Sequence, residues 1–153
     1  MNTDIHQKAR QRLDERLLPL KPENRFTVPP KGWIRAVRDA LGMTGVQFAK
    51  RLKVSPQSVD ALEKSEANGS IKVDTLRRAA EALDCTLVYA LVPKTSLANT
   101  VRNRARKIAI RELERVAHTM KLEAQGTGDA DLEARIDAYI RLTLKDRDLW
   151  SQP

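Results

Sequence analysis

The sequence predicts a mostly α-helical protein with one short β-strand, and two observations support that prediction. Apolar residues recur at intervals of three and four in several segments, which is the spacing of one buried helix face. Residues 86–93, by contrast, are apolar and partly β-branched and end at a proline, which favours a strand. With 153 residues and 41% hydrophobic side chains, the chain can form one small domain with helical extensions.

A short helix is predicted to follow Thr44. Gln47 stands three residues later, so the threonine oxygen and the glutamine side chain can each accept the other residue's backbone N–H, which makes a capping box. An apolar stripe follows on one face, made by Val46, Phe48, Ala49 and Leu52. The small side chain of Ala49 would allow another helix to cross closely at this point.

A second helix is predicted to begin at Pro56. Lys53 and Val54 make the turn, and Ser55 is a good N-cap in front of a proline at the first helical position, where no N–H is needed. The inward positions of this helix are Val59 and Leu62. Two short helices joined by a tight turn, with polar residues on the outer face of the second, are typical of a helix-turn-helix that reads DNA.

Further helices are expected on either side of this pair. Apolar residues keep helical spacing over residues 33–41 before it and over residues 73–83 after it. The four helices together predict a compact core. Cys85 stands where an apolar residue would end the last of these helices, so we expect it in that core.

The stretches TGVQFAKRL, VSPQSV and DTLRRAAEALDC, in this order, make residues 33–85 resemble a Cro/repressor-type (Xre-like, lambda-repressor-like) helix-turn-helix domain. That family usually has glycine at the position of Lys53, where the backbone often turns left-handed, so the turn here is expected to be reshaped or strained. Residues 64–70 are expected to form a longer loop than is typical of the family.

A wider resemblance covers almost the whole chain. The stretches ARQRLDERL, PPKGWIRAVRDALGMTG and SVDALEKSEANGSIKVDTLRRAAEALDCTLVYALVP are similar to the bacterial family called mobile mystery protein A. This resemblance implies an operon-borne repressor that regulates its own operon. It also implies that the neighbouring gene encodes a Fic-domain protein, so that the pair would act as antitoxin and toxin.

The candidate DNA-binding residues are Thr44, Lys53, Ser55, Gln57, Ser58, Ala61 and Lys64. The resemblance to phage repressors implies a base-reading glutamine at Gln57 and a phosphate contact at Ser58. Glutamine can pair with N6 and N7 of adenine, so Gln57 is expected to read a base directly. Lys50 and Lys72 join the candidate lysines as contacts to phosphate, whose effect would be independent of sequence and sensitive to salt. The net charge of +8 fits such a polyanionic partner.

The predicted strand at residues 86–93 has no obvious partner in the chain. We therefore expect it to pair with the same strand of a second copy across a two-fold axis, because a lone strand leaves its backbone unsatisfied. The dimerisation residues would be Leu87, Val88, Tyr89 and Leu91. A homodimer would present two recognition helices to a near-palindromic operator in duplex DNA.

Helices are also expected near both ends of the chain. Residues 5–18 form one, followed by a proline-rich linker, and residues 97–124 form a long helix that turns at Gly126 into a last helix, giving a C-terminal helical hairpin. The basic face of the long helix could bind DNA, meet an acidic partner or simply be solvated. The expected organisation is an arm and linker (1–31), a helix-turn-helix domain (32–85), a strand (86–93) and a helical hairpin (94–153).

The resemblance also implies a way to restrain a Fic enzyme. Inhibitory helices of that system commonly carry Ser or Thr, three residues, then Glu followed by Gly or Asn. Thr119 and Glu123 have this spacing, although Ala124 stands in the last position. An ordinary polar pair on a helix is the alternative interpretation.

Other function classes find little support in the sequence. Cys85 is the single cysteine, and no metal-ligand spacing, cofactor motif or set of nucleophile and base is present, so we expect neither catalysis nor a cofactor. No segment is apolar enough for a membrane span or secretory signal, which predicts a cytoplasmic protein. Two alternatives to a plain repressor stay open: a protein-interaction module that mainly inhibits a partner enzyme, and a phage-like regulator that senses a small effector through its arms.

Overall fold

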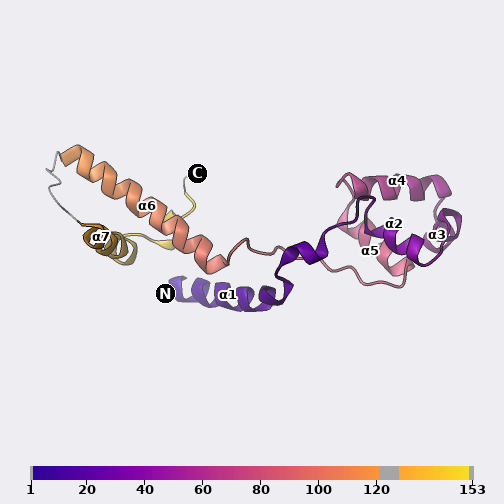
Figure 1. Ribbon diagram of the computed structural model, residues 1–153, viewed down its shortest axis with the longest axis horizontal. Helices are drawn as coiled ribbons and strands as arrows, with labels where there is room; N and C mark the ends of the chain where they lie inside the picture. Colours follow the sequence, from indigo (N-terminus) through magenta and orange to yellow (C-terminus); the bar gives the residue numbers. More distant parts are fainter. Residues whose placement is uncertain (1, 121–127, 152–153) are drawn as a thin grey trace. The chain divides into compact units, whose positions relative to one another are not determined.

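The computed structural model describes residues 2–120 and 128–151, and these residues are mostly helical (Figure 1). Seven α-helices occur in them: α1 (Asn2–Leu17), α2 (Trp33–Ala40), α3 (Gly45–Leu52), α4 (Pro56–Ala67), α5 (Val73–Ala82), α6 (Leu97–Met120) and α7 (Asp129–Leu142). Short 3₁₀ helices cover Leu18–Leu20, Glu23–Phe26 and Asp146–Asp148. The chain divides into two compact units, residues 22–91 and a unit made of residues 1–21 with 92–153.

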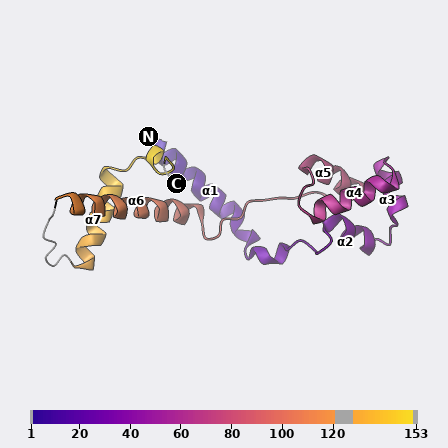
Figure 2. The same cartoon turned by 90° about the horizontal axis from the view of Figure 1, so that it is seen from above.

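In the unit of residues 22–91, α2 to α5 gather around one hydrophobic core (Figures 1 and 2). The core is made by Ile34, Phe48, Ala49, Val59, Ala79 and Leu83. Phe48 and Val59 are fully buried, one from each helix of the predicted pair. Ala49 is buried in the same cluster, which agrees with a close crossing of α3 and α4.

Two carboxylates of α4 tie this helix to α2. The backbone N–H groups of Trp33 and Ile34 donate to the Glu66 carboxylate over 2.9 and 2.8 Å, so Glu66 caps the start of α2. Gly32 is required at this point, because it has φ 88° and an added Cβ would lie 2.6 Å from Glu66 Oε1. Arg38 donates to the buried Glu63 over 2.6 and 3.2 Å and to the Met43 carbonyl over 2.9 Å.

Three expectations from the sequence are wrong within this unit. The loop expected at residues 64–70 is shorter, since α4 continues to Ala67, and the cap that Glu66 provides explains why. Residues 86–93 are not a strand among the described residues, because no other segment offers them a ladder of hydrogen bonds. Cys85 is exposed, since it follows Asp84, which has φ 54° and turns the chain away at the end of α5.

In the other unit, α1 and α7 both pack against α6 (Figures 1 and 2). The Asp14 carboxylate accepts hydrogen bonds from the N–H groups of Leu97 and Ala98, at 2.7 and 3.1 Å, so α1 caps the start of α6. The buried apolar residues of this unit are Ala105, Ala109, Ile136 and Leu149. Small side chains on α6 therefore make room for its neighbours.

Candidate nucleic-acid interface

The start of α3 is fixed by the predicted capping box. The Gln47 N–H donates to Thr44 Oγ1 over 3.2 Å, and the Thr44 N–H donates to Gln47 Oε1 over 2.8 Å. These two bonds satisfy the N–H groups at N3 and the N-cap. The N–H groups of Gly45 and Val46 lie at the start of α3 and therefore at the positive end of the helix dipole. Among the described residues, no side chain caps these two groups.

The turn between α3 and α4 contains a strained residue. Lys53 has φ 60° and ψ 43°, the left-handed conformation that the family's glycine would adopt easily. Ser55 then caps α4, with its Oγ accepting the Ser58 N–H over 3.2 Å, and Pro56 occupies the first turn. The start of α4 therefore lies where the sequence predicted it.

Residues 56–64 of α4 show a clear division between two faces. Val59 and Glu63 are buried, whereas Gln57, Asp60, Ala61 and Lys64 are exposed. A hollow of about 310 Å³ runs between this exposed face and the start of α3. Its lining consists of Thr44, Gly45, Val46, Pro56, Gln57 and Asp60. The amide of Gln57 is thus available to a molecule that approaches the α3–α4 pair.

The sequence-predicted site residues fall into three groups. Gln57, Ala61 and Lys64 share the exposed face of α4, and Thr44 borders the same hollow as Gln57. Ser55 and Ser58 are exposed, but their hydroxyl groups lie 2.8 Å apart and bond to each other, so part of their hydrogen-bonding capacity is used in the cap. Lys53, Lys50 and Lys72 are exposed on the turn, on α3 and before α5.

Asp60 is the residue of this face that sequence reasoning missed. It lines the same hollow as Gln57, and no hydrogen bond or ion pair joins it to the described residues. Its position three residues after Gln57 on a helix could have revealed it, since residues at that spacing share a face.

Arg38, in contrast, is not available to DNA. Its hydrogen bond to Glu63 raises the pKa of Arg38 above the ordinary arginine value and keeps the charge inside the unit.

The candidate dimerisation segment is largely exposed in the single chain. Val88 is 79% and Leu91 85% exposed, and Tyr89 is exposed as well. Leu87 and Val88 border an apolar groove of about 260 Å³ between α2 and α5. Of the candidate inhibitory pair, Thr119 belongs to α6, whereas Glu123 lies outside the described residues.

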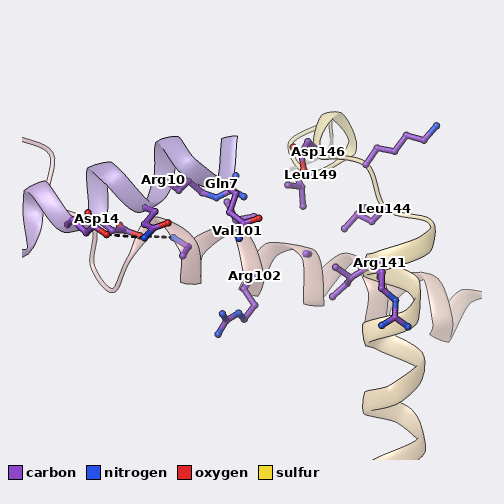
Figure 3. A pocket seen from close by; sticks show the side chains of 15 residues that line it. Gln7, Arg10, Asp14, Val101, Arg102, Arg141, Leu144, Asp146 and Leu149 are labelled. Atoms are coloured by element: carbon purple, nitrogen blue, oxygen red, sulfur yellow. Dashed lines mark hydrogen bonds between the residues drawn. The ribbon is translucent and has the colours of Figure 1, made fainter. Parts of the chain in front are cut away.

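The unit that contains α6 has a cavity of its own, of about 750 Å³, between α1, α6 and the end of α7. Apolar side chains such as Val101, Leu144 and Leu149 form much of its wall. Figure 3 shows the side chains of Arg102 and Arg141 directed away from α1, so these cations do not converge on one point.

Metal-binding clusters and membrane spans are both absent from the described residues. No group of three or more His, Cys, Asp or Glu side chains that could hold a metal ion occurs within residues 2–120 and 128–151. None of the helices in those ranges is long and apolar enough to cross a membrane.

Comparison with known proteins identifies the α2–α5 region. Residues 34–89 match the protein-family model described as helix-turn-helix. Neither a curated protein nor a solved structure matches the chain. The comparisons thus confirm the narrower resemblance and give no support to the wider one, to mobile mystery protein A. Residues 34–89 are a helix-turn-helix domain, and this domain supports a DNA-binding transcription regulator.

Proposed function

We propose that this chain is a sequence-specific repressor that places α4 in the major groove of duplex DNA. The observation that supports this most directly is the exposed face of α4, where Gln57 lies in the first turn of a helix that is capped by Ser55 and begins with Pro56. Recognition helices of this motif contact base edges with their N-terminal residues. Gln57 is proposed to read adenine, while Thr44, Ser55, Ser58, Lys53 and Lys64 position the domain on phosphates and Ala61 packs against base edges.

A selection from a pool of random duplexes tests this function and does not require the operator sequence to be identified first. The full chain should enrich a defined sequence, and Gln57→Ala should lose preference at one base pair while it still binds. Glu81→Ala, an exposed change on α5 away from α4, is the matched control and should keep the preference. Failure of the wild-type chain to enrich any sequence would contradict the proposed function.

We further propose that the repressor is a homodimer held together by the segment that contains Leu87, Val88, Tyr89 and Leu91. Two features support it: Val88, Tyr89 and Leu91 are exposed, and Leu87 and Val88 border the apolar groove between α2 and α5. Apolar surface of this kind is normally covered in a stable protein. A two-fold dimer would also match two half-sites roughly 34–36 Å apart.

Light scattering measures the mass of the protein in solution and thus tests whether this segment holds a dimer together. The double change Val88→Glu and Leu91→Glu should reduce the mass to that of one chain and weaken operator binding. Leu142→Glu, which alters a comparably exposed leucine of the other unit, should leave the mass unchanged. A dimer that persists in the double variant would rule out this segment as the contact.

A second candidate function is that of an antitoxin that holds a Fic-domain protein encoded next to it. The resemblance to mobile mystery protein A suggests it, and the exposed side chains of Ile5, Leu142 and Trp150 offer apolar surface for a protein partner. Co-expression with the neighbouring gene product tests it. The expected result is a complex that survives purification and in which nucleotidyl transfer by the Fic-domain protein is blocked. If the two co-expressed proteins purify separately, this second function is contradicted.

A further inference from the structure

We propose that Asp60 is a specificity-determining residue that selects cytosine in the half-site. This inference rests on the proposed function, since it concerns the same exposed face of α4. Asp60 and Gln57 border one hollow at the α3–α4 pair and are three residues apart on the helix. A carboxylate at this position needs an explanation, because the face is expected to approach a polyanion.

A structural role does not account for Asp60. Its side chain is exposed, and no hydrogen bond or ion pair connects it to the residues that the structure describes. It influences the Arg38 guanidinium through space, but Glu63 makes the hydrogen bonds to that group and Asp60 is the weakest of the influences on it. The carboxylate is therefore free to accept hydrogen bonds from a ligand.

The chemistry of the major groove restricts what that ligand can be. A carboxylate only accepts hydrogen bonds. The donors on the base edges are N4 of cytosine and N6 of adenine, whereas guanine offers two acceptors and thymine an acceptor and a methyl group. Adenine also presents N7 as an acceptor next to N6, and a carboxylate would be repelled by it. Cytosine is thus the base that suits Asp60 best.

The helix geometry places this base close to the one that Gln57 reads. Three residues along an α-helix advance about 4.5 Å, at about 1.5 Å per residue. Successive base pairs are about 3.4 Å apart. Side chains at this spacing also point to the same side of the helix. Asp60 should therefore meet the base pair next to the adenine read by Gln57.

Asp60 would also act against wrong sequences. Where guanine or thymine occupies the position, that base offers the carboxylate only acceptors, because the amino donor belongs to the paired base on the other strand. The carboxylate then remains near negatively charged phosphates and the partial negative charge of the base acceptors. Binding to those sequences is weakened, so the carboxylate contributes discrimination as well as attraction. Replacing it should raise affinity for non-operator DNA while the cytosine preference is lost.

The same selection from random duplexes tests this role, with wild type, Asp60→Ala, Asp60→Asn and the charge-matched control Glu81→Gln. Wild type should prefer cytosine about tenfold beside the adenine position. Asp60→Ala should abolish that preference, and Asp60→Asn should shift it to adenine, because an amide can pair with N6 and N7. Glu81→Gln removes the same charge from α5 and should keep the cytosine preference.

The outcomes separate the two proposals. If wild type enriches no sequence, DNA reading itself fails and the role of Asp60 fails with it. If wild type enriches a sequence but Asp60→Ala keeps the same base at every position, the role of Asp60 is refuted and the proposed function stands. Equal effects of Asp60→Asn and Glu81→Gln would also refute it, since they would show a contribution of net charge alone.

Discussion

Each unit of the chain has an arginine–glutamate pair that joins two helices, and the two pairs differ in their surroundings. In the helix-turn-helix unit, Arg38 and Glu63 are 11% and 6% exposed and bond over 2.6 Å. In the other unit, Arg106 of α6 and Glu133 of α7 are 43% and 50% exposed. The same kind of ion pair is therefore buried in one unit and exposed to solvent in the other.

The difference shows which unit depends on its charges for its architecture. A buried pair becomes costly when one partner is removed, because the remaining charge has lost its water and its counter-ion. A pair in water is screened by solvent and salt and contributes little. The orientation of α4 relative to α2 should thus depend on Arg38 and Glu63, while α6 and α7 should depend mainly on apolar packing.

Removal of one member of the buried pair should have the largest effect. Glu63→Leu leaves the Arg38 guanidinium without its partner and should destabilise the helix-turn-helix unit by about 3–5 kcal/mol. Urea unfolding followed by circular dichroism measures this loss. The double change Arg38→Met and Glu63→Leu should recover most of it, since no uncompensated charge remains. If Glu63→Leu alone were as stable as wild type, the helix-turn-helix unit would not depend on its buried charged pair.

The second prediction concerns charges that face outward from the same unit. Lys64→Ala should weaken binding to operator and non-operator DNA by the same factor and lower the slope of log affinity against log salt by about 1. A titration at several salt concentrations measures both. The protein's own stability should be unchanged, in contrast to Glu63→Leu, although the two residues are neighbours on α4. A change in base preference would show that Lys64 reads bases instead.

The parts of the fold that could be predicted from the sequence are those with local causes. The capping box of Thr44 and Gln47 and the start of α4 at Ser55 and Pro56 depend on residues at most three positions apart, and both are present. The division of α4 into a buried and an exposed face follows from periodicity alone. The exposed face of α4 that forms the candidate interface, which includes Gln57, could therefore be located from the sequence.

The features that the sequence did not reveal depend on contacts between distant residues. Glu66 extends α4 because it caps α2, which lies 32 and 33 positions away in the chain. The strand at residues 86–93 is predicted by composition, but a strand exists only where a partner supplies the other half of its ladder. Asp60 does not stand out in the sequence, because its significance comes from the hollow that it shares with the start of α3.

A third, smaller effect is expected at the turn. Lys53→Gly should stabilise the helix-turn-helix unit by about 1 kcal/mol, because a residue with a Cβ is strained in the left-handed conformation. Lys50→Gly, three positions earlier within α3, should destabilise it by about 1 kcal/mol, as glycine does inside helices. Thermal unfolding should show a higher midpoint than wild type for Lys53→Gly and a lower midpoint for Lys50→Gly. Equal shifts in one direction would show that the turn is not strained.

The smallest effect should come from the exposed pair. The hydrogen bond from Arg106 lowers the pKa of Glu133 below the ordinary glutamate value. A carboxyl whose pKa is lower in the folded state stabilises the protein above its unfolded pKa, and the contribution is lost as pH falls through the folded pKa. Because both side chains are in water, Glu133→Gln should leave the unfolding midpoint nearly unchanged at neutral pH and high salt. Any difference from wild type should appear at low salt and disappear on acidification. A large loss at high salt would mean that α6 and α7, like α2 and α4, depend on their charged pair.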